Sequence, residues 1–183
     1  MIQKPDKIIK RIIKAIGQRQ AVLVIGDWDE ALINGIKENQ NSITQVSNLN
    51  QELPDNSFTR IVAEYSFLLY DRRGLRPQTP TVSNTTSFYG EVRRLLLPTG
   101  MLIISANCEL NFFEKLFKKE QLNTPAIKPK VLQDQIHDNG FLIDGYYGYP
   151  GGHLLMMAVI QNKNVTTLFT SEKQETTVKY NHA

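Results

Sequence analysis

The chain has 183 residues, of which 41% are hydrophobic and 21% charged, a composition typical of one soluble globular domain. No apolar run reaches the roughly 18 residues that a membrane span needs, and the first residues lack the apolar segment of a secretory signal. The net charge of +3 arises in residues 1–20, which carry a surplus of five positive charges, so the remainder carries −2. This excludes a globally basic surface that coats nucleic acid, and we expect a cytoplasmic or other intracellular protein.

Isoleucines recur at helical spacing near the start of the chain, with lysines and arginines between them: Ile8, Ile9, Ile12, Ile13 and Ile16. This pattern predicts a basic amphipathic helix within residues 1–19 that ends at Gly17 and packs on a domain of residues 20–161. The basic face of this helix is either solvated or a contact site for an acidic partner or membrane surface. Organelle targeting stays open, because the segment is poor in acids.

Short apolar runs then alternate with helical patterns along the chain. The predicted strands cover residues 21–26, 42–47, 60–67, 101–105, 141–147 and 153–161. The predicted helices cover residues 31–36, 89–97, 111–120 and 131–140. Glycines and prolines predict a long polar loop at 71–87 and a turn at 98–100. Residues 162–183 form a polar tail that we expect to be disordered.

This order of elements predicts an α/β fold. Alternating strands and helices favour a three-layer sandwich, in which helices cover both faces of a mostly parallel sheet. The last two strands are joined by the tight connection at residues 148–152, so the final strand is expected to be antiparallel.

Three segments in this order resemble the class I S-adenosylmethionine-dependent methyltransferases, in particular the small-molecule type called type 11. They are LPDNSFTRIVAEYSFLLY, EVRRLLLPTGMLIIS, and HDNGFLIDGYY followed by LLMMAVI. AVLVIGDWDE stands where the family has its first strand and glycine loop. The resemblance implies a Rossmann-like, seven-stranded sheet with its last strand antiparallel. It also implies a cofactor over the carboxyl ends of strands one and two.

The glycine loop departs from the family's acid-x-Gly-x-Gly-x-Gly pattern. The acid position is Val24, and the three glycine positions read Gly26, Trp28 and Glu30. An indole at the close-approach position is expected to obstruct the methionine or adenosine part of the cofactor. Val22 and Ile61 are only 39 positions apart, so we expect the strand-two unit, with its ribose-binding acid, to be shortened or missing.

If S-adenosylmethionine is bound, the resemblance indicates four cofactor-binding candidates: Gly26, Asp27, Asp29 and Asn48. The alternatives are that Asp29 caps the following helix, that Asp27 is solvated and that Asn48 is an ordinary turn residue. The catalytic residues are unknown. The candidates on the methyl-acceptor side are Glu64, Tyr65 and Tyr70, whose alternative role is packing.

Other chemistry-bearing residues give weaker signals. The histidines lack the spacing of zinc ligands, so no metal site is expected; they are His137, His153 and His182. Cys108 is the single cysteine and is expected to be a buried small hydrophobic residue. Three tyrosines near the last turn form either a turn or an exposed aromatic contact patch; they are Tyr146, Tyr147 and Tyr149.

Two functions from different classes follow. The first is a non-catalytic methyltransferase-like module that uses no cofactor and binds a protein partner through the first helix or the 71–87 loop. Its pattern of degeneration is similar to that of the amino-terminal domain of anamorsin. The second is an active S-adenosylmethionine-dependent methyltransferase with a divergent pocket, in which proximity and orientation supply most of the catalysis.

Overall fold

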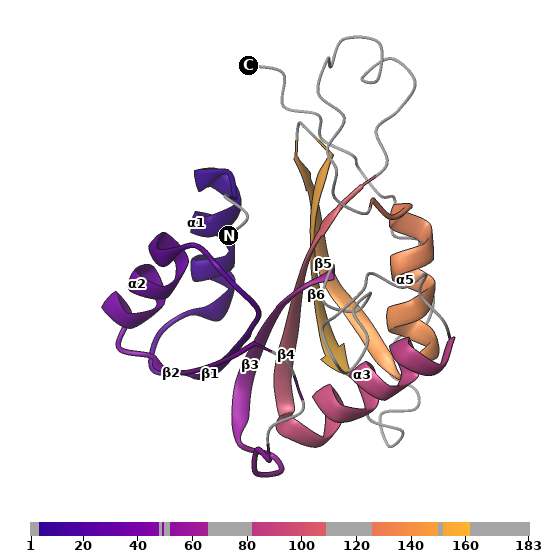
Figure 1. The fold of residues 1–183 in the computed structure, drawn as a ribbon, viewed down its shortest axis with the longest axis horizontal. Coiled ribbons are helices and arrows are strands. Elements are labelled where there is room, and N and C mark those ends of the chain that lie inside the picture. Colours follow the sequence, from indigo (N-terminus) through magenta and orange to yellow (C-terminus); the bar gives the residue numbers. More distant parts are fainter. Residues whose placement is uncertain are drawn as a thin grey trace, which may run out of the picture.

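The computed structural model describes residues 4–47, 49, 52–65, 82–108, 126–149 and 152–161, with the backbone alone for residues 82–86. A mixed sheet has the order β2-β1-β3-β4-β6-β5 (Figure 1). Its strands are β1 (Ala21–Ile25), β2 (Ser42–Val46), β3 (Phe58–Glu64), β4 (Leu96–Asn107), β5 (Phe141–Tyr149) and β6 (His153–Ile160). The helices are α1 (Asp6–Ile16), α2 (Glu30–Glu38), α3 (Val82–Leu95) and α5 (Pro129–Asp138).

The pairing of the strands confirms the mostly parallel sheet with an antiparallel last strand. β1, β2, β3 and β4 pair in parallel, whereas β6 is antiparallel to both of its neighbours, β4 and β5. The described sheet has six strands rather than seven. β2 lies directly beside β1, so the second position is filled and the outer position beyond it has no strand among the described residues. The second position of the sheet is therefore occupied, whereas the strand-two unit was expected to be shortened or missing.

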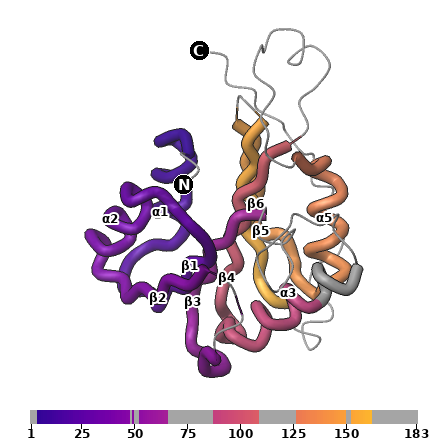
Figure 2. The backbone as a smooth tube through the Cα atoms, viewed as in Figure 1, coloured from indigo at the N-terminus to yellow at the C-terminus, as the bar shows by residue number. Residues whose placement is uncertain are grey.

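Helices cover both faces of the sheet, which confirms the three-layer α/β sandwich. On one face, α1 and α2 pack over the side chains of Val22, Val24 and Val62. On the other face, α3 and α5 pack over the alternate side chains, such as Leu23 and Ile61. The inner strands β1, β3, β4 and β6 are mostly buried on both sides because their apolar runs supply both faces, whereas the outer strands β2 and β5 are more exposed. Figure 2 shows that the early part of the chain forms one half of the molecule and the later part the other.

Helix α1 forms as the isoleucine spacing predicts. Ile8, Ile9, Ile12 and Ile16 are all buried against the sheet and α2. The helix ends at Gly17, whose φ of 80° lies in the left-handed region that favours glycine. Because α1 ends just before β1 begins, the helix starts at the other end of that strand. Its first turn therefore lies near the carboxyl ends of the parallel strands.

Other boundaries differ from the sequence predictions. The 71–87 loop prediction is wrong for residues 82–87, which already belong to α3, and the remainder of that loop lies outside the described residues. The turn predicted at 98–100 is part of β4, where the pairing with β3 shifts register. The helix predicted at 111–120 and the tail after residue 161 lie outside the described residues.

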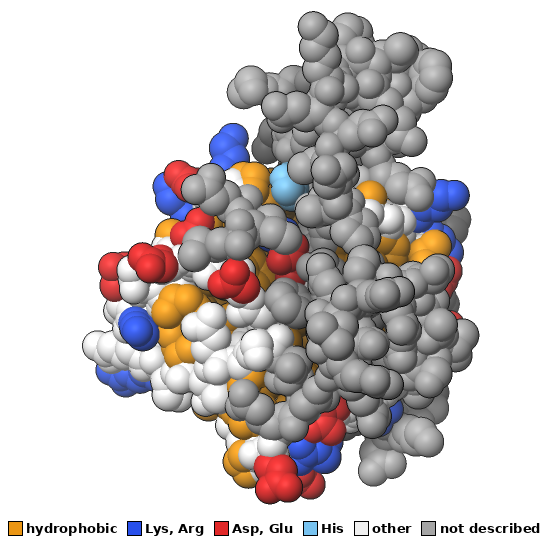
Figure 3. Space-filling model, in the orientation of Figure 1, with side chains coloured by type: hydrophobic (Ala, Val, Ile, Leu, Met, Phe, Trp, Pro, Cys, Tyr) orange, Lys and Arg blue, Asp and Glu red, His pale blue; other side chains and the backbone are white. Residues whose placement is uncertain are grey.

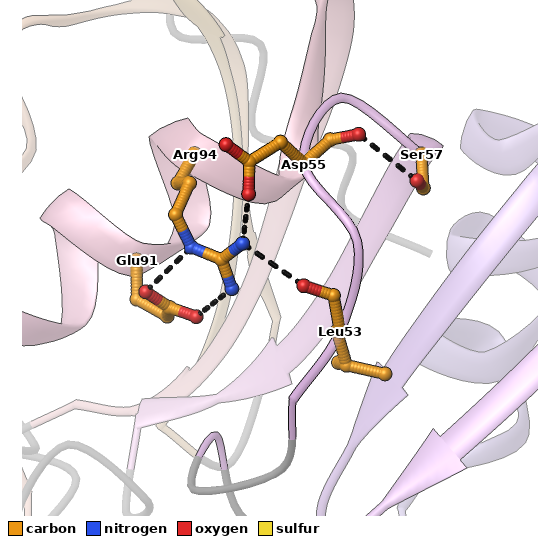
Figure 4. A network of polar contacts seen from close by, with 5 residues as sticks. All are labelled: Leu53, Asp55, Ser57, Glu91 and Arg94. Atoms are coloured by element: carbon orange, nitrogen blue, oxygen red, sulfur yellow. Dashed lines mark hydrogen bonds and ion pairs between the residues drawn. The ribbon is translucent and has the colours of Figure 1, made fainter.

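The turn before β3 is held to the end of α3 by Arg94, as Figure 4 shows. Its guanidinium donates to both carboxylate oxygens of Glu91, to Asp55, and to the Leu53 carbonyl at 2.9 Å. The Ser57 hydroxyl closes the turn by donating to the Asp55 carbonyl at 3.0 Å. This network lies at the amino-terminal end of β3. It therefore holds that strand at the end that is far from its carboxyl end.

Candidate functional site

The carboxyl ends of β1, β2 and β3 meet at one edge of the sheet, which we call the carboxyl edge. In open α/β sheets, ligands bind outside the carboxyl ends of the strands. The strands end here at Ile25, Val46 and Glu64. The candidates of the sequence analysis that the structure describes all follow or end these strands. Their contacts decide what this edge can bind.

The turn from β1 to α2 is held by local hydrogen bonds. Gly26 is buried with φ of 107°, a conformation that favours glycine, and its N–H donates to the Val46 carbonyl at 2.8 Å. Asp29 caps α2, since its carboxylate accepts from the Ala31 N–H at 2.8 Å. Asp27 lies between them and is exposed. Asp29 therefore has the capping role that the sequence analysis gave as its alternative.

The Trp28 ring lies in the apolar layer beneath α1. The residue is 4% exposed and packs in the cluster that contains Ile8 and Ile9. Its indole N–H donates to the Ile25 carbonyl at 2.9 Å. The ring is therefore buried beside the end of β1, in the apolar layer that α1 also enters, and it does not project outward from the sheet edge.

The end of β2 carries no carboxylate. Ser47, which is exposed, follows the strand, and Asn48 lies outside the described residues. In the methyltransferase family that this chain resembles, an acidic residue at the end of the second strand contacts the ribose hydroxyls. A serine hydroxyl can make only a neutral hydrogen bond there, which is roughly half as strong as a charge-assisted one.

Glu64 and Lys4 form a buried ion pair at the end of β3. The Lys4 ammonium lies 2.8 Å from a Glu64 carboxylate oxygen, and the two side chains are 1% and 5% exposed. The partners are 60 positions apart in the chain. Lys4 precedes α1 and had no signal in the sequence, because nothing local distinguishes it from the exposed lysines that follow. The Glu64 carboxylate is engaged by this ammonium.

Tyr65 faces the other side of the sheet from Glu64. It is 3% exposed and belongs to the cluster that contains Tyr89. Burial raises the pKa of both phenols, so both are protonated at neutral pH and neither is a ready base. Tyr70 lies outside the described residues. The structure therefore places Glu64 and Tyr65 on opposite faces and does not bring them together.

The three tyrosines near the last turn do not form one patch. Tyr147 and Tyr149 pack partly against the α1 side of the sheet, and the Arg11 guanidinium lies 3.9 Å from the centroid of the Tyr147 ring. Tyr146 alternates with them along β5 and is 46% exposed. Its exposed apolar neighbours on the strand are Leu142 and Ile143.

The remaining candidates give no reactive centre in the described part of the chain. No group of three or more His, Cys, Asp or Glu side chains there is arranged to hold a metal ion. Cys108 is half-buried, and burial raises the pKa of its thiol to about 11. Among the same residues, no helix has the length and apolar character to span a membrane. On the face drawn in Figure 3, Lys and Arg side chains are interspersed with Asp and Glu over the α1–α2 half.

Several solved structures of methyltransferases are similar to this chain in overall fold. The 1,6-didemethyltoxoflavin-N1-methyltransferase of Burkholderia thailandensis, solved with S-adenosylhomocysteine, is 13% identical over 85% of this chain and 78% of its own, with a TM-score of 0.62. A SAM-dependent methyltransferase from Aquifex aeolicus is 15% identical over 86% and 94%, with a TM-score of 0.52. A third, from Methanosarcina mazei, is 15% identical over 88% and 99%, also at 0.52.

Comparisons of sequence add no relative. No family model matches the chain, and no curated protein matches it. At identities this low the likeness concerns the fold alone. The six-stranded sheet, its antiparallel β6 and the structural neighbours agree in this respect. The chain has a Rossmann-like fold of the class I methyltransferase type.

Proposed function

We propose that this chain is a methyltransferase-like domain in which S-adenosylmethionine binding is weakened or lost, and that it acts through contacts with a protein partner. The observation that carries this proposal is the buried ion pair of Lys4 and Glu64. The chain's own ammonium fills the carboxyl end of β3, at the edge where ligands of this fold bind. A cofactor using that position has to displace Lys4 and expose a buried carboxylate.

The neighbouring strand ends support the same proposal. The turn after β1 keeps one glycine of three. The end of β2 presents Ser47 in place of an acid. Each charged hydrogen bond to a ribose hydroxyl contributes about 1.5–3 kcal/mol. Losing two such bonds weakens binding by roughly two to four orders of magnitude.

The outward face of α1 is the proposed contact surface for the partner. Lys7, Lys10 and Lys14 are exposed along it, whereas the apolar side of the helix is buried. This arrangement suits an acidic protein surface. The second candidate surface, proposed from the sequence alone, is the predicted 71–87 loop without residues 82–87, which belong to α3. We propose that the chain is similar in this respect to the amino-terminal domain of anamorsin. That domain keeps the fold without usable cofactor binding.

Calorimetric titration of the full chain tests the cofactor half of the proposal. We expect no detectable heat with S-adenosylmethionine or S-adenosylhomocysteine at millimolar concentration. Far-UV circular dichroism of the same sample verifies that the protein is folded. A dissociation constant in the micromolar range for either compound would refute the loss of binding.

Charge reversal tests the partner half. Because α1 contributes buried isoleucines to the core, deleting it would unfold the domain, so surface substitutions are the sharper tool. We expect Lys7→Glu/Lys10→Glu to abolish capture of the proteins that bind the wild-type chain. The matched control is Lys128→Glu/Lys130→Glu, which reverses two exposed lysines at the start of α5. Equal capture by both double variants would contradict a role for α1.

An active enzyme with a divergent pocket is the second candidate. The observation that favours it is the inward direction of the Trp28 ring, which leaves the outer side of the β1 turn without an indole. In that case Gly26, Asp27 and Asp29, with Asn48, would contact the cofactor. Glu64, Tyr65 and Tyr70 would be the acceptor-side candidates. Micromolar cofactor binding together with methyl transfer to an acceptor would establish this alternative.

A further inference from the structure

We propose that the carboxyl end of β3 is a built binding site for a primary ammonium group, and that Lys4 occupies it as an internal ligand. The group that binds the ammonium is the Glu64 carboxylate, and the buried Ser105 hydroxyl lies on the neighbouring strand, on the same α1 side of the sheet. The ligand class of the site is an unbranched primary alkylammonium ion. This proposal and the proposed function use the same ion pair, but the tests below measure the occupancy of the site and not the binding of S-adenosylmethionine.

The first observation is the geometry of the pair. The Lys4 ammonium and a Glu64 carboxylate oxygen are 2.8 Å apart, and both side chains are at least nine-tenths buried. A charge-assisted hydrogen bond of this length is well formed. An ammonium has three donors, so one carboxylate oxygen uses only part of its capacity. The ammonium therefore keeps donor capacity that this carboxylate oxygen does not use.

The second observation is the hydroxyl of Ser105. This residue is 0% exposed, and its Oγ has no hydrogen-bond partner among the described residues. Ser105 on β4 is the register partner of Glu64 on β3. Paired residues of neighbouring strands direct their side chains to the same face. A buried, unpartnered acceptor therefore lies beside the carboxylate, on the face that receives the ammonium.

The third observation is that the fold does not depend on Lys4 for anchoring α1. Four isoleucines of the helix are already buried. Lys4 lies before the helix, and the N-cap residue Pro5 makes no side-chain capping bond. Removing one partner of a buried ion pair is strongly destabilising, because it leaves the other charge uncompensated. Since the buried isoleucines still hold α1, we expect Lys4→Ala to be a folded but destabilised domain whose ammonium site is vacant.

Chemical rescue of Lys4→Ala tests the proposal directly. The substitution removes three methylene groups and the ammonium of Lys4. The ion n-propylammonium has three carbons and one ammonium, so it can fill the space that these atoms leave. We expect Lys4→Ala to have a lower Tm than wild type, and n-propylammonium chloride to raise it. At ten times the dissociation constant the rise should be roughly 3–6 °C. Tetramethylammonium chloride at the same concentration has no N–H donor and should give no such rise.

Two further variants make the rescue specific. In Lys4→Ala/Glu64→Gln the carboxylate is absent, so n-propylammonium should have no more effect than tetramethylammonium. Lys37→Ala removes an exposed lysine of α2 and should show neither the loss nor the rescue. Equal effects of both salts on Lys4→Ala, or equal rescue of the double variant, would overturn the proposal. If Lys4→Ala does not fold, its refolding yield in the two salts is compared in the same way.

Lysine labelling of the wild-type chain gives a second, independent readout. Because the Lys4 ammonium is buried and paired, we expect it to react with an amine-acylating reagent at least tenfold more slowly than Lys7 or Lys10. Peptide mass spectrometry of the labelled chain measures each rate. Rates for Lys4 and Lys7 within a factor of two would show that the site is not occupied, and would refute the internal-ligand proposal. Cofactor titration has no bearing on this result, so the two proposals fail separately.

Discussion

Replacement of Trp28 measures how firmly the end of β1 is joined to α1. The ring is 4% exposed in an apolar cluster, and its N–H donates to the Ile25 carbonyl. Trp28→Ala removes a buried ring, which costs about 3–5 kcal/mol in protein cores. This is a large part of the roughly 5–15 kcal/mol by which a domain is stable. Trp28→Phe retains apolar contact but leaves the carbonyl without its donor, at a cost of about 1–3 kcal/mol.

Urea unfolding followed by far-UV circular dichroism measures both variants. With an m-value of about 2 kcal/mol/M, the midpoint should fall by roughly 1.5–2.5 M for Trp28→Ala and by less for Trp28→Phe. Trp28 is the single tryptophan, so its fluorescence reports its own burial in the wild type. Blue-shifted emission that resists acrylamide quenching is expected. A quenchable, red-shifted emission together with a midpoint unchanged in Trp28→Ala would refute the inward placement of the ring.

Three smaller effects follow from local contacts. Asp29→Ala removes the carboxylate that caps the Ala31 N–H, so thermal unfolding should show a loss of about 1 kcal/mol; no loss would mean that the cap is not formed in solution. The pKa of the Cys108 thiol is raised to about 11, so alkylation of this thiol should be slow at pH 8. The alkylation rate should rise roughly tenfold per pH unit as the pH approaches this pKa. A rate that levels off near pH 9 would contradict this burial. Arg94→Lys loses the bidentate hydrogen bonds to the Glu91 carboxylate. The Tm should therefore fall slightly at low salt and less at high salt. A fall in Tm that does not depend on salt would indicate a loss of packing instead.

Sequence patterns predicted those parts of the fold that depend on neighbours within a few positions. The isoleucine spacing predicted α1, and Gly17 marked its end. Asp29 was correctly proposed as a cap because capping joins residues two or three positions apart. Apolar runs predicted the strands because both faces of a parallel sheet are buried. The start of α3 was missed, since polar residues at 82–87 resemble a loop.

The chemistry of the carboxyl edge was decided by the tertiary structure. The sequence gives no reason to join Lys4 to Glu64, because the pair is 60 positions apart and becomes adjacent only when α1 packs across the sheet. The same packing turns the Trp28 ring inward, although its position in the loop suggested an obstruction. Local periodicity determines which elements form, since it acts within one turn or one strand. Which charges meet at a strand end depends on the assembled layers, and that arrangement exists only in the folded chain.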